Sequence, residues 1–163
     1  MSIDVFLSIA EISGIFIAFG ALISAFGNSS QIEKLHLQGL VGAGLVVLIA
    51  ALIPVGLSYF SIPEHFIMKW SSAGFLLVIW IVIIGTQDRE LAPVGIEHLK
   101  SHLFFAGILI VLEFVIQISL LVTIFGALES YWESLFVLAL LLNLLQAAIF
   151  LSHMILVKSA SDT

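Results

Sequence analysis

The chain alternates between long apolar runs and short polar breaks. Five runs each hold about 20 mainly apolar residues, the number that a helix needs to cross about 30 Å of hydrocarbon. They lack the period-two alternation and the length of about ten residues that are typical of outer-membrane strands. The pattern therefore predicts a single all-α integral membrane domain over residues 1–163, a bundle of about five transmembrane helices at residues 4–26, 35–60, 66–85, 102–126 and 131–157.

The composition supports this fold class and narrows the function. Of the 163 residues, 61% are hydrophobic and 10% are charged, whereas soluble domains carry about 25% charged residues. The absence of cysteine excludes disulfides, thiolate metal sites and cysteine nucleophiles. The net charge of -6 argues against nucleic-acid binding. No phosphate-binding loop or catalytic triad pattern occurs, so we expect no enzyme and no cofactor.

The few basic residues predict an orientation in the membrane. If the five runs cross a bilayer, four of the five basic residues share the side of the C-terminus, namely Lys34, Arg89, Lys100 and Lys158. Only Lys69 belongs to the side of the N-terminus. Because loops rich in Lys and Arg stay in the cytoplasm, the N-terminus is predicted to lie outside and the C-terminus inside a cell (inner or plasma) membrane, with the lipid bilayer as the surroundings of the helices.

Polar side chains interrupt three of the apolar runs and require an explanation. An ionisable group in hydrocarbon costs at least about 2.5 kcal/mol on insertion scales. Helical spacing aligns the polar residues of the fourth run on one face and those of the fifth run on another. The simplest packing turns these faces toward each other and toward the first run, which predicts a polar ladder made of Glu11, Glu113, Gln117, Asn143, Gln146 and His153.

The ladder has two interpretations. Buried carboxylates exchange protons or bind cations, so the first interpretation is an oligomeric channel or carrier for protons or small cations. A chain this short builds a pathway most easily by sharing it between identical subunits in a closed homo-oligomer. The alternative is a non-transporting membrane scaffold or accessory subunit, in which the polar groups hydrogen-bond between helices and contribute about 0.6 to 2 kcal/mol each.

A histidine pair raises the question of a metal site. His98 and His102 are four residues apart, a spacing that places both imidazoles on one helix face and suits Zn²⁺ or Ni²⁺. The alternative is a pair of interfacial histidines that solvate a helix end and respond to pH.

Small residues form a third pattern. In the first run they follow one another at steps of three and four residues, at Ala10, Gly14, Ala18, Ala21 and Ala25, and the second run repeats the spacing at Gly39 and Ala43. Such spacing lets helix backbones approach closely. It predicts a helix interface at Gly14, Ala18, Gly39 and Ala43, either within one subunit or between subunits.

The amino-acid sequence of the first run resembles that of other membrane proteins. The segment AEISGIFIAFGALIS, followed by a short polar loop and a glycine-rich run, resembles small multi-pass bacterial membrane proteins without a characterised activity. The resemblance covers about the first third of the chain and implies a bacterial envelope location. It implies no activity and no site residues.

Overall fold

The chain folds into five long helices. A computed structural model describes residues 2–26, 31–85 and 103–161. The helices are α1 (Ile3–Phe26), α2 (Gln31–Ser58), α3 (Glu64–Gly85), α5 (Leu103–Ile124) and α6 (Trp132–Ser161), and a short 3-10 turn, η1 (Glu129–Tyr131), precedes α6. The predicted all-α fold with five long apolar helices is confirmed over the described residues. The largest differences in the boundaries are at α2, which begins at Gln31 rather than at residue 35, and at α6, which continues to Ser161 rather than ending at residue 157.

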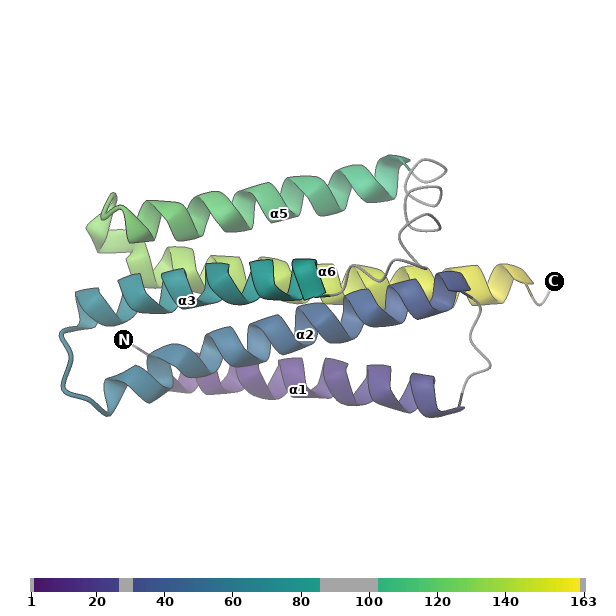
Figure 1. Cartoon of the computed structure of the whole chain (residues 1–163), viewed down its shortest axis with the longest axis horizontal. Coiled ribbons are helices and arrows are strands. Elements are labelled where there is room, and N and C mark those ends of the chain that lie inside the picture. The colour runs from purple at the N-terminus through teal and green to yellow at the C-terminus, as the bar shows by residue number, and fades with distance from the viewer. Residues whose placement is uncertain (1, 27–30, 86–102, 162–163) are drawn as a thin grey trace.

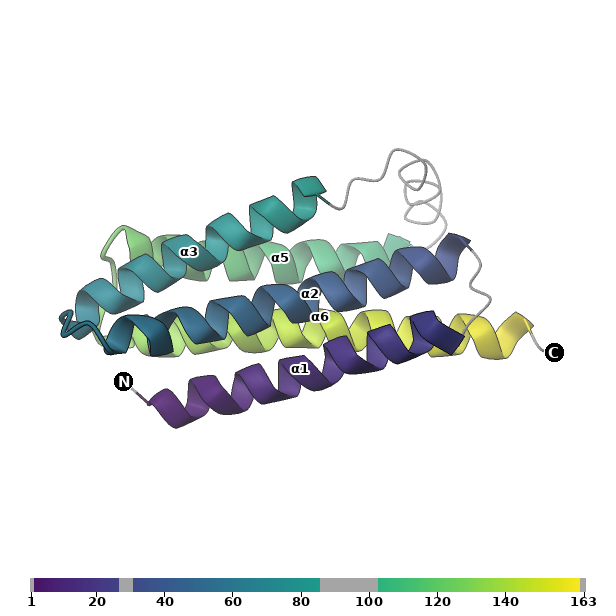
Figure 2. The same ribbon diagram turned by 60° about the horizontal axis from the view of Figure 1, so that its bottom comes forward.

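Successive helices run up and down a single bundle (Figure 1). The two chain termini therefore lie at opposite ends, which we call the N-end and the C-end of the bundle. Helix α2 is central and packs against α1, α3 and α6, while α5 packs against α6 and α3. Helix α1 lies at one edge of the bundle, mainly against α2 (Figures 1 and 2). One long side of α1 therefore has no partner within the described residues.

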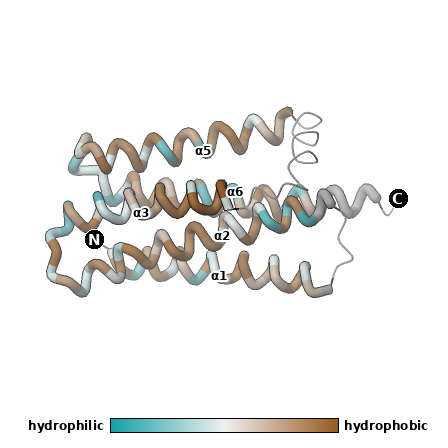
Figure 3. Tube along the Cα trace, viewed as in Figure 1, coloured by the Kyte–Doolittle hydropathy of each residue, from teal (hydrophilic) through white to brown (hydrophobic). Residues whose placement is uncertain are grey.

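The outward faces of the bundle are apolar. Hydrophobic residues dominate most of the coloured part of each of the five helices (Figure 3). Large side chains are exposed on three different helices, namely Phe19 on α1, Leu77 and Ile81 on α3, and Phe114 on α5. A monomer in water rarely exposes apolar surface on this scale, whereas hydrocarbon favours it. The surface is thus that of a multi-pass membrane protein.

Aromatic side chains fill the N-end half of the bundle. Phe6 of α1, Phe75 of α3 and Phe136 of α6 are fully buried. The ring of Phe136 meets each of the other two edge-on, with centroids 5.8 Å apart in both pairs. Such edge-to-face pairs stabilise by about 0.5–1.5 kcal/mol beyond the burial of their surface. Ile116 and Leu120 of α5 complete this core without exposed surface.

The α5–α6 turn at the N-end depends on a glycine. Gly126 has φ +80°, a left-handed conformation that costs glycine little. The amides of Gly126 and Ala127 donate to the carbonyls of Thr123 and Val122, which closes α5 with a Schellman motif. The indole nitrogen of Trp132 then donates to the carbonyl of Ala127 at 2.7 Å. This bond holds the start of α6 against the end of α5.

Close packing of α1 on α2 uses a different face of α1 from the one predicted. The hydroxyl of Ser13 donates to the carbonyl of Gly44, and a Cβ at Gly44 would meet Ile17 at 2.9 Å. A Cβ at Gly20 would meet Val41 at 2.6 Å. By contrast, a Cβ at Gly14 would meet nothing within 4 Å.

Of the other predicted interface residues, Ala18 is exposed on α1 and has no close helix contact of this kind. On α2, Gly39 does allow a close approach, because its Cβ would lie 2.8 Å from the ring of Phe150 on α6. Ala43 is half-buried and lines a pocket. Within the protomer, the contact between α1 and α2 therefore rests on Ser13, Gly20 and Gly44 instead of Gly14 and Ala18.

Candidate functional site

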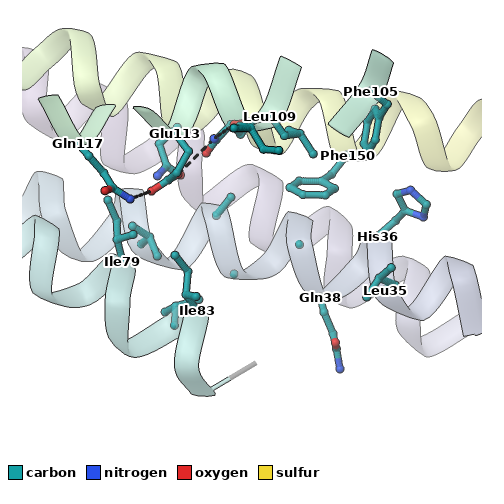
Figure 4. Close-up of a pocket in the computed structure, with 18 of the residues that line it drawn as sticks. Leu35, His36, Gln38, Ile79, Ile83, Phe105, Leu109, Glu113, Gln117 and Phe150 are labelled. Carbon is teal, nitrogen blue, oxygen red and sulfur yellow. Dashed lines mark hydrogen bonds between the residues drawn. The ribbon is translucent and has the colours of Figure 1, made fainter. Parts of the chain in front are cut away.

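A partly open pocket lies in the C-end half of the bundle, between α2, α3, α5 and α6 (Figure 4). Its volume is about 520 Å³, within the range of about 300–1,000 Å³ that is typical of small-molecule sites. Helix α2 makes room for it, because Gly39, Gly42 and Ala43 present little or no side chain along this wall. The other walls are mainly aliphatic, with Val46 on α2, Ile79, Val82 and Ile83 on α3, and Leu109 and Ile110 on α5.

Glu113 is the acidic residue of this pocket. It lies ten residues, or about 15 Å, from Leu103 at the start of the 22-residue helix α5, close to its middle. Its side chain is half-buried. None of the described residues that line the pocket is a lysine or an arginine. The carboxylate therefore has only neutral hydrogen-bond donors around it.

Two amides hold the Glu113 carboxylate. Gln117, one turn further along α5, donates from Nε2 to Oε1 of Glu113 at 2.9 Å. Gln146 of α6 donates from Nε2 to Oε2 of Glu113 at 3.3 Å and lies equally far from the carbonyl of Leu109. Figure 4 shows these bonds at one end of the pocket. The carboxylate is thus fixed by one contact within its own helix and one between helices.

Asn143 adds an acceptor without a partner. Its side chain on α6 is 4% exposed and lines the same pocket. Its Oδ1 atom is buried and accepts no hydrogen bond. A buried acceptor that stays unpaired costs about 1–3 kcal/mol. The lining of the pocket therefore includes a side chain whose buried oxygen destabilises the fold, and no described residue offsets this free-energy cost.

An aromatic cluster forms the opposite end of the pocket, toward the C-end of the bundle. His36 of α2 is buried and stacks on His153 of α6, with ring centroids 4.7 Å apart and planes at 20°. Phe105 of α5 and Phe150 of α6 pack against both histidines and against each other. Figure 4 shows His36, Phe105 and Phe150 away from Glu113 and Gln117. The polar and aromatic ends are joined by the aliphatic walls.

The structure brings together most of the predicted ladder. Glu113, Gln117, Asn143 and Gln146 all line the one pocket. His153 belongs to the aromatic cluster at the C-end. The structure does not bring Glu11 to this site, because its side chain is exposed on α1 and does not line the pocket.

The predicted metal pair, His98 and His102, lies outside the described residues. Among the residues that are described, no three His, Cys, Asp or Glu side chains gather as a metal site would require.

Sequence reasoning missed several residues of the site. His36 and Phe105 line the pocket, although no spacing pattern linked them to the predicted ladder. In the closed N-end half, Ser71 and Ser72 of α3 are buried, and their hydroxyls have no hydrogen-bond partner. In a sequence, a serine flanked by apolar residues does not indicate an unpaired hydroxyl, because this hydroxyl normally donates a hydrogen bond to a carbonyl of its own helix.

Comparisons with protein-family models, with curated proteins and with solved structures each gave no match for this chain. We therefore infer the function from the geometry of the site.

The two amide residues of α6 are expected to respond in opposite ways to replacement by leucine. Gln146→Leu removes the hydrogen bond to Glu113 and the one to the Leu109 carbonyl, and should destabilise the fold by about 1–2 kcal/mol. Asn143→Leu removes an unpaired acceptor at similar volume, and should leave stability unchanged or raise it by about 1 kcal/mol. Denaturation of the purified proteins in SDS–detergent mixtures measures both. Equal destabilisation by the two changes would show that Asn143 has a structural role after all.

Proposed function

We propose that the protein is an inner-membrane carrier that takes up a proton or a small cation at Glu113. The observation that carries this proposal is a carboxylate near the middle of a membrane-length helix, fixed by two amides, in a pocket whose described lining contains no lysine or arginine. A carboxylate at this depth is costly and is the type of residue that marks ion pathways and proton relays in membrane proteins.

The shape of the pocket favours a carrier over an open channel. The residues that line it lie in the C-end half of the bundle. The N-end half is filled by Phe6, Phe75 and Phe136, which are fully buried. A carrier needs a site that opens to one side at a time, whereas a channel needs a continuous pore. A pocket whose lining is confined to the C-end half of the protomer supports the first of these arrangements.

The alternative is a scaffold or accessory subunit, and one observation favours it. The hydrogen bond from Gln146 to Glu113 joins α6 to α5, which is what polar groups do when they only fix helices in lipid. The two functions differ in what they require of Glu113. Helix fixation needs a hydrogen-bonding side chain, whereas ion uptake needs a carboxylate that can be charged.

Glu113→Gln is therefore expected to separate these functions. Glutamine keeps the size and the hydrogen-bonding ability of the side chain but cannot take up a proton or carry charge. The variant should fold, and flux in proteoliposomes should fall at least tenfold, measured for protons, Na⁺ and K⁺ under imposed gradients. The matched control is Glu129→Gln, in the exposed turn η1. Parent-like flux in the Glu113→Gln protein, or no flux in the parent protein across these ions, would favour the scaffold.

We also propose that the C-end of the bundle faces the cytoplasm. Four of the five basic residues, Lys34, Arg89, Lys100 and Lys158, belong to that side of the chain. A cysteine at Ser130, which is exposed at the N-end, should react with an impermeant thiol reagent in intact cells. A cysteine at Ser29 should react only after the membrane is opened, and the reverse labelling would invert the orientation.

The outward face of α1 supports a further part of the proposal, a homo-oligomer. Positions that alternate by four and three residues along α1 are all exposed, namely Asp4, Ser8, Glu11, Ile15, Ala18, Leu22 and Ala25. A repeat averaging 3.5 residues is the pattern of a helix that packs along a second helix. Glu11 lies eight residues, or about 12 Å, into this helix. A carboxylate at that depth is costly against lipid, so a protein surface covering it would be favourable.

Gly14 and Ala18 would then contact a second copy of the chain, because they make no close contact within their own protomer. Gly14→Leu should leave the fold intact and lower the oligomer fraction in membranes several-fold, measured by single-molecule photobleaching. Two glycines provide matched controls. Gly107→Leu on α5, where a Cβ also meets nothing within 4 Å, should change neither the fold nor the oligomer fraction. Gly44→Leu should destabilise the protomer by about 1–3 kcal/mol through overpacking. An unchanged oligomer in Gly14→Leu would mean that this face meets lipid.

A further inference from the structure

The polar end of the pocket is rich in hydrogen-bond acceptors. A carboxylate only accepts hydrogen bonds, so Gln117 and Gln146 must turn their NH₂ groups toward Glu113. Their own oxygens remain as acceptors, and the buried Oδ1 of Asn143 is a further acceptor without a partner. A ligand that complements this end must therefore donate several hydrogen bonds and carry positive charge.

The rest of the pocket is unsuited to a bare metal ion. A dehydrated cation such as Ca²⁺ takes six to eight oxygen ligands around it. Here the side-chain oxygens of Glu113, Gln117 and Gln146 gather at one end of a space of about 520 Å³, and Gln38 is a single further amide of the lining, nearer the other end (Figure 4). The remainder is lined by hydrocarbon, including Val46, Ile79 and Ile83, and ends at Phe105 and Phe150. That lining complements an apolar body.

Asn143 gives the ligand a defined contact. Its Oδ1 is buried and unpaired although the side chain is 4% exposed. Buried acceptors are nearly always paired, with protein or with another bound group. A primary ammonium group has three N–H donors, enough to serve Glu113 and Asn143 together.

We infer that the pocket binds an amphipathic organic cation, a primary ammonium group attached to an aromatic or branched aliphatic body. The ammonium group pairs with Glu113 and with Oδ1 of Asn143, and the body lies along the aliphatic walls toward Phe150. The inference rests on the proposed role of Glu113 as the cation-binding residue and names the class of its substrate.

Binding to the full-length protein in lipid nanodiscs tests the inference, with empty nanodiscs as the blank. The probe is radiolabelled phenethylammonium in equilibrium dialysis at pH 7, where the amine is charged. Its competitors are 2-phenylethanol, which has the same body without the charge, and ammonium chloride, which has the charge without the body. Phenethylammonium should bind at least tenfold more tightly than either competitor. Equal affinity for the alcohol or for ammonium would overturn the inference.

Variants locate the binding. Glu113→Gln should weaken the binding of phenethylammonium at least tenfold. Asn143→Leu, which is expected to fold at least as stably as the parent, should weaken it about five- to tenfold. Ala43→Leu should weaken it by narrowing the apolar part of the pocket. Glu129→Gln should bind as the parent does. Unchanged affinity in both Glu113→Gln and Asn143→Leu would place the probe elsewhere and overturn the assignment.

A failure of the proposed substrate class can be distinguished from a failure of the carrier proposal. If phenethylammonium does not bind while Glu113-dependent flux of protons or Na⁺ persists in liposomes, the substrate class is wrong and the carrier proposal stands. If the probe binds through Glu113 and Asn143 but neither it nor any ion crosses the membrane, the pocket is a binding site and the carrier proposal fails.

Discussion

Hydrocarbon offers no partner to a polar group, and this constraint governs where the polar side chains of the bundle lie. Several hydroxyls in the helices meet it locally. Ser119 and Thr123 each donate to the carbonyl four residues earlier, and Ser152 does the same on α6. Ser13 instead donates across to Gly44, and so joins α1 to α2. The groups that escape this local solution are the ones that need a functional explanation.

The small residues of α2 serve two purposes on two sides of one helix. At Gly44 the missing side chain lets α1 approach until Ile17 fills the space. At Gly42 and Ala43 the small residues form one wall of the pocket instead. At Gly39 the ring of Phe150 occupies the space that a side chain would fill. This ring also helps to close the aromatic end of the pocket. A glycine-rich helix at the centre of a bundle can therefore provide both tight packing and a cavity.

The sequence predicted the helices well because their existence depends on the length of the apolar runs, and that length is explicit. It also predicted that Glu113, Gln117, Asn143 and Gln146 meet in one place, since polar groups in hydrocarbon gather on facing helix surfaces. It misjudged the rotation of α1. A helix that is hydrophobic all round has no polar face to fix its orientation, and α1 has small residues on two faces. The face with Ser13 and Gly20 packs inward, while the face with Gly14 and Ala18 does not.

The glutamates within the long apolar helices α1 and α5 differ in where their hydrogen-bond partners lie. Glu113 has its partners inside the protomer, where Gln117 and Gln146 occupy both carboxylate oxygens. These bonds alone would be enough for a structural role. They do not involve Asn143, whose buried oxygen has no hydrogen-bond partner among the described residues, an arrangement that costs free energy. Glu11 has the opposite arrangement, an exposed carboxylate on a helix face without a partner in the described protomer. Asn143 and Glu11 are thus two polar groups for which the described protomer supplies no partner, and they are the basis of the proposed ligand in the pocket and of the proposed second chain against α1.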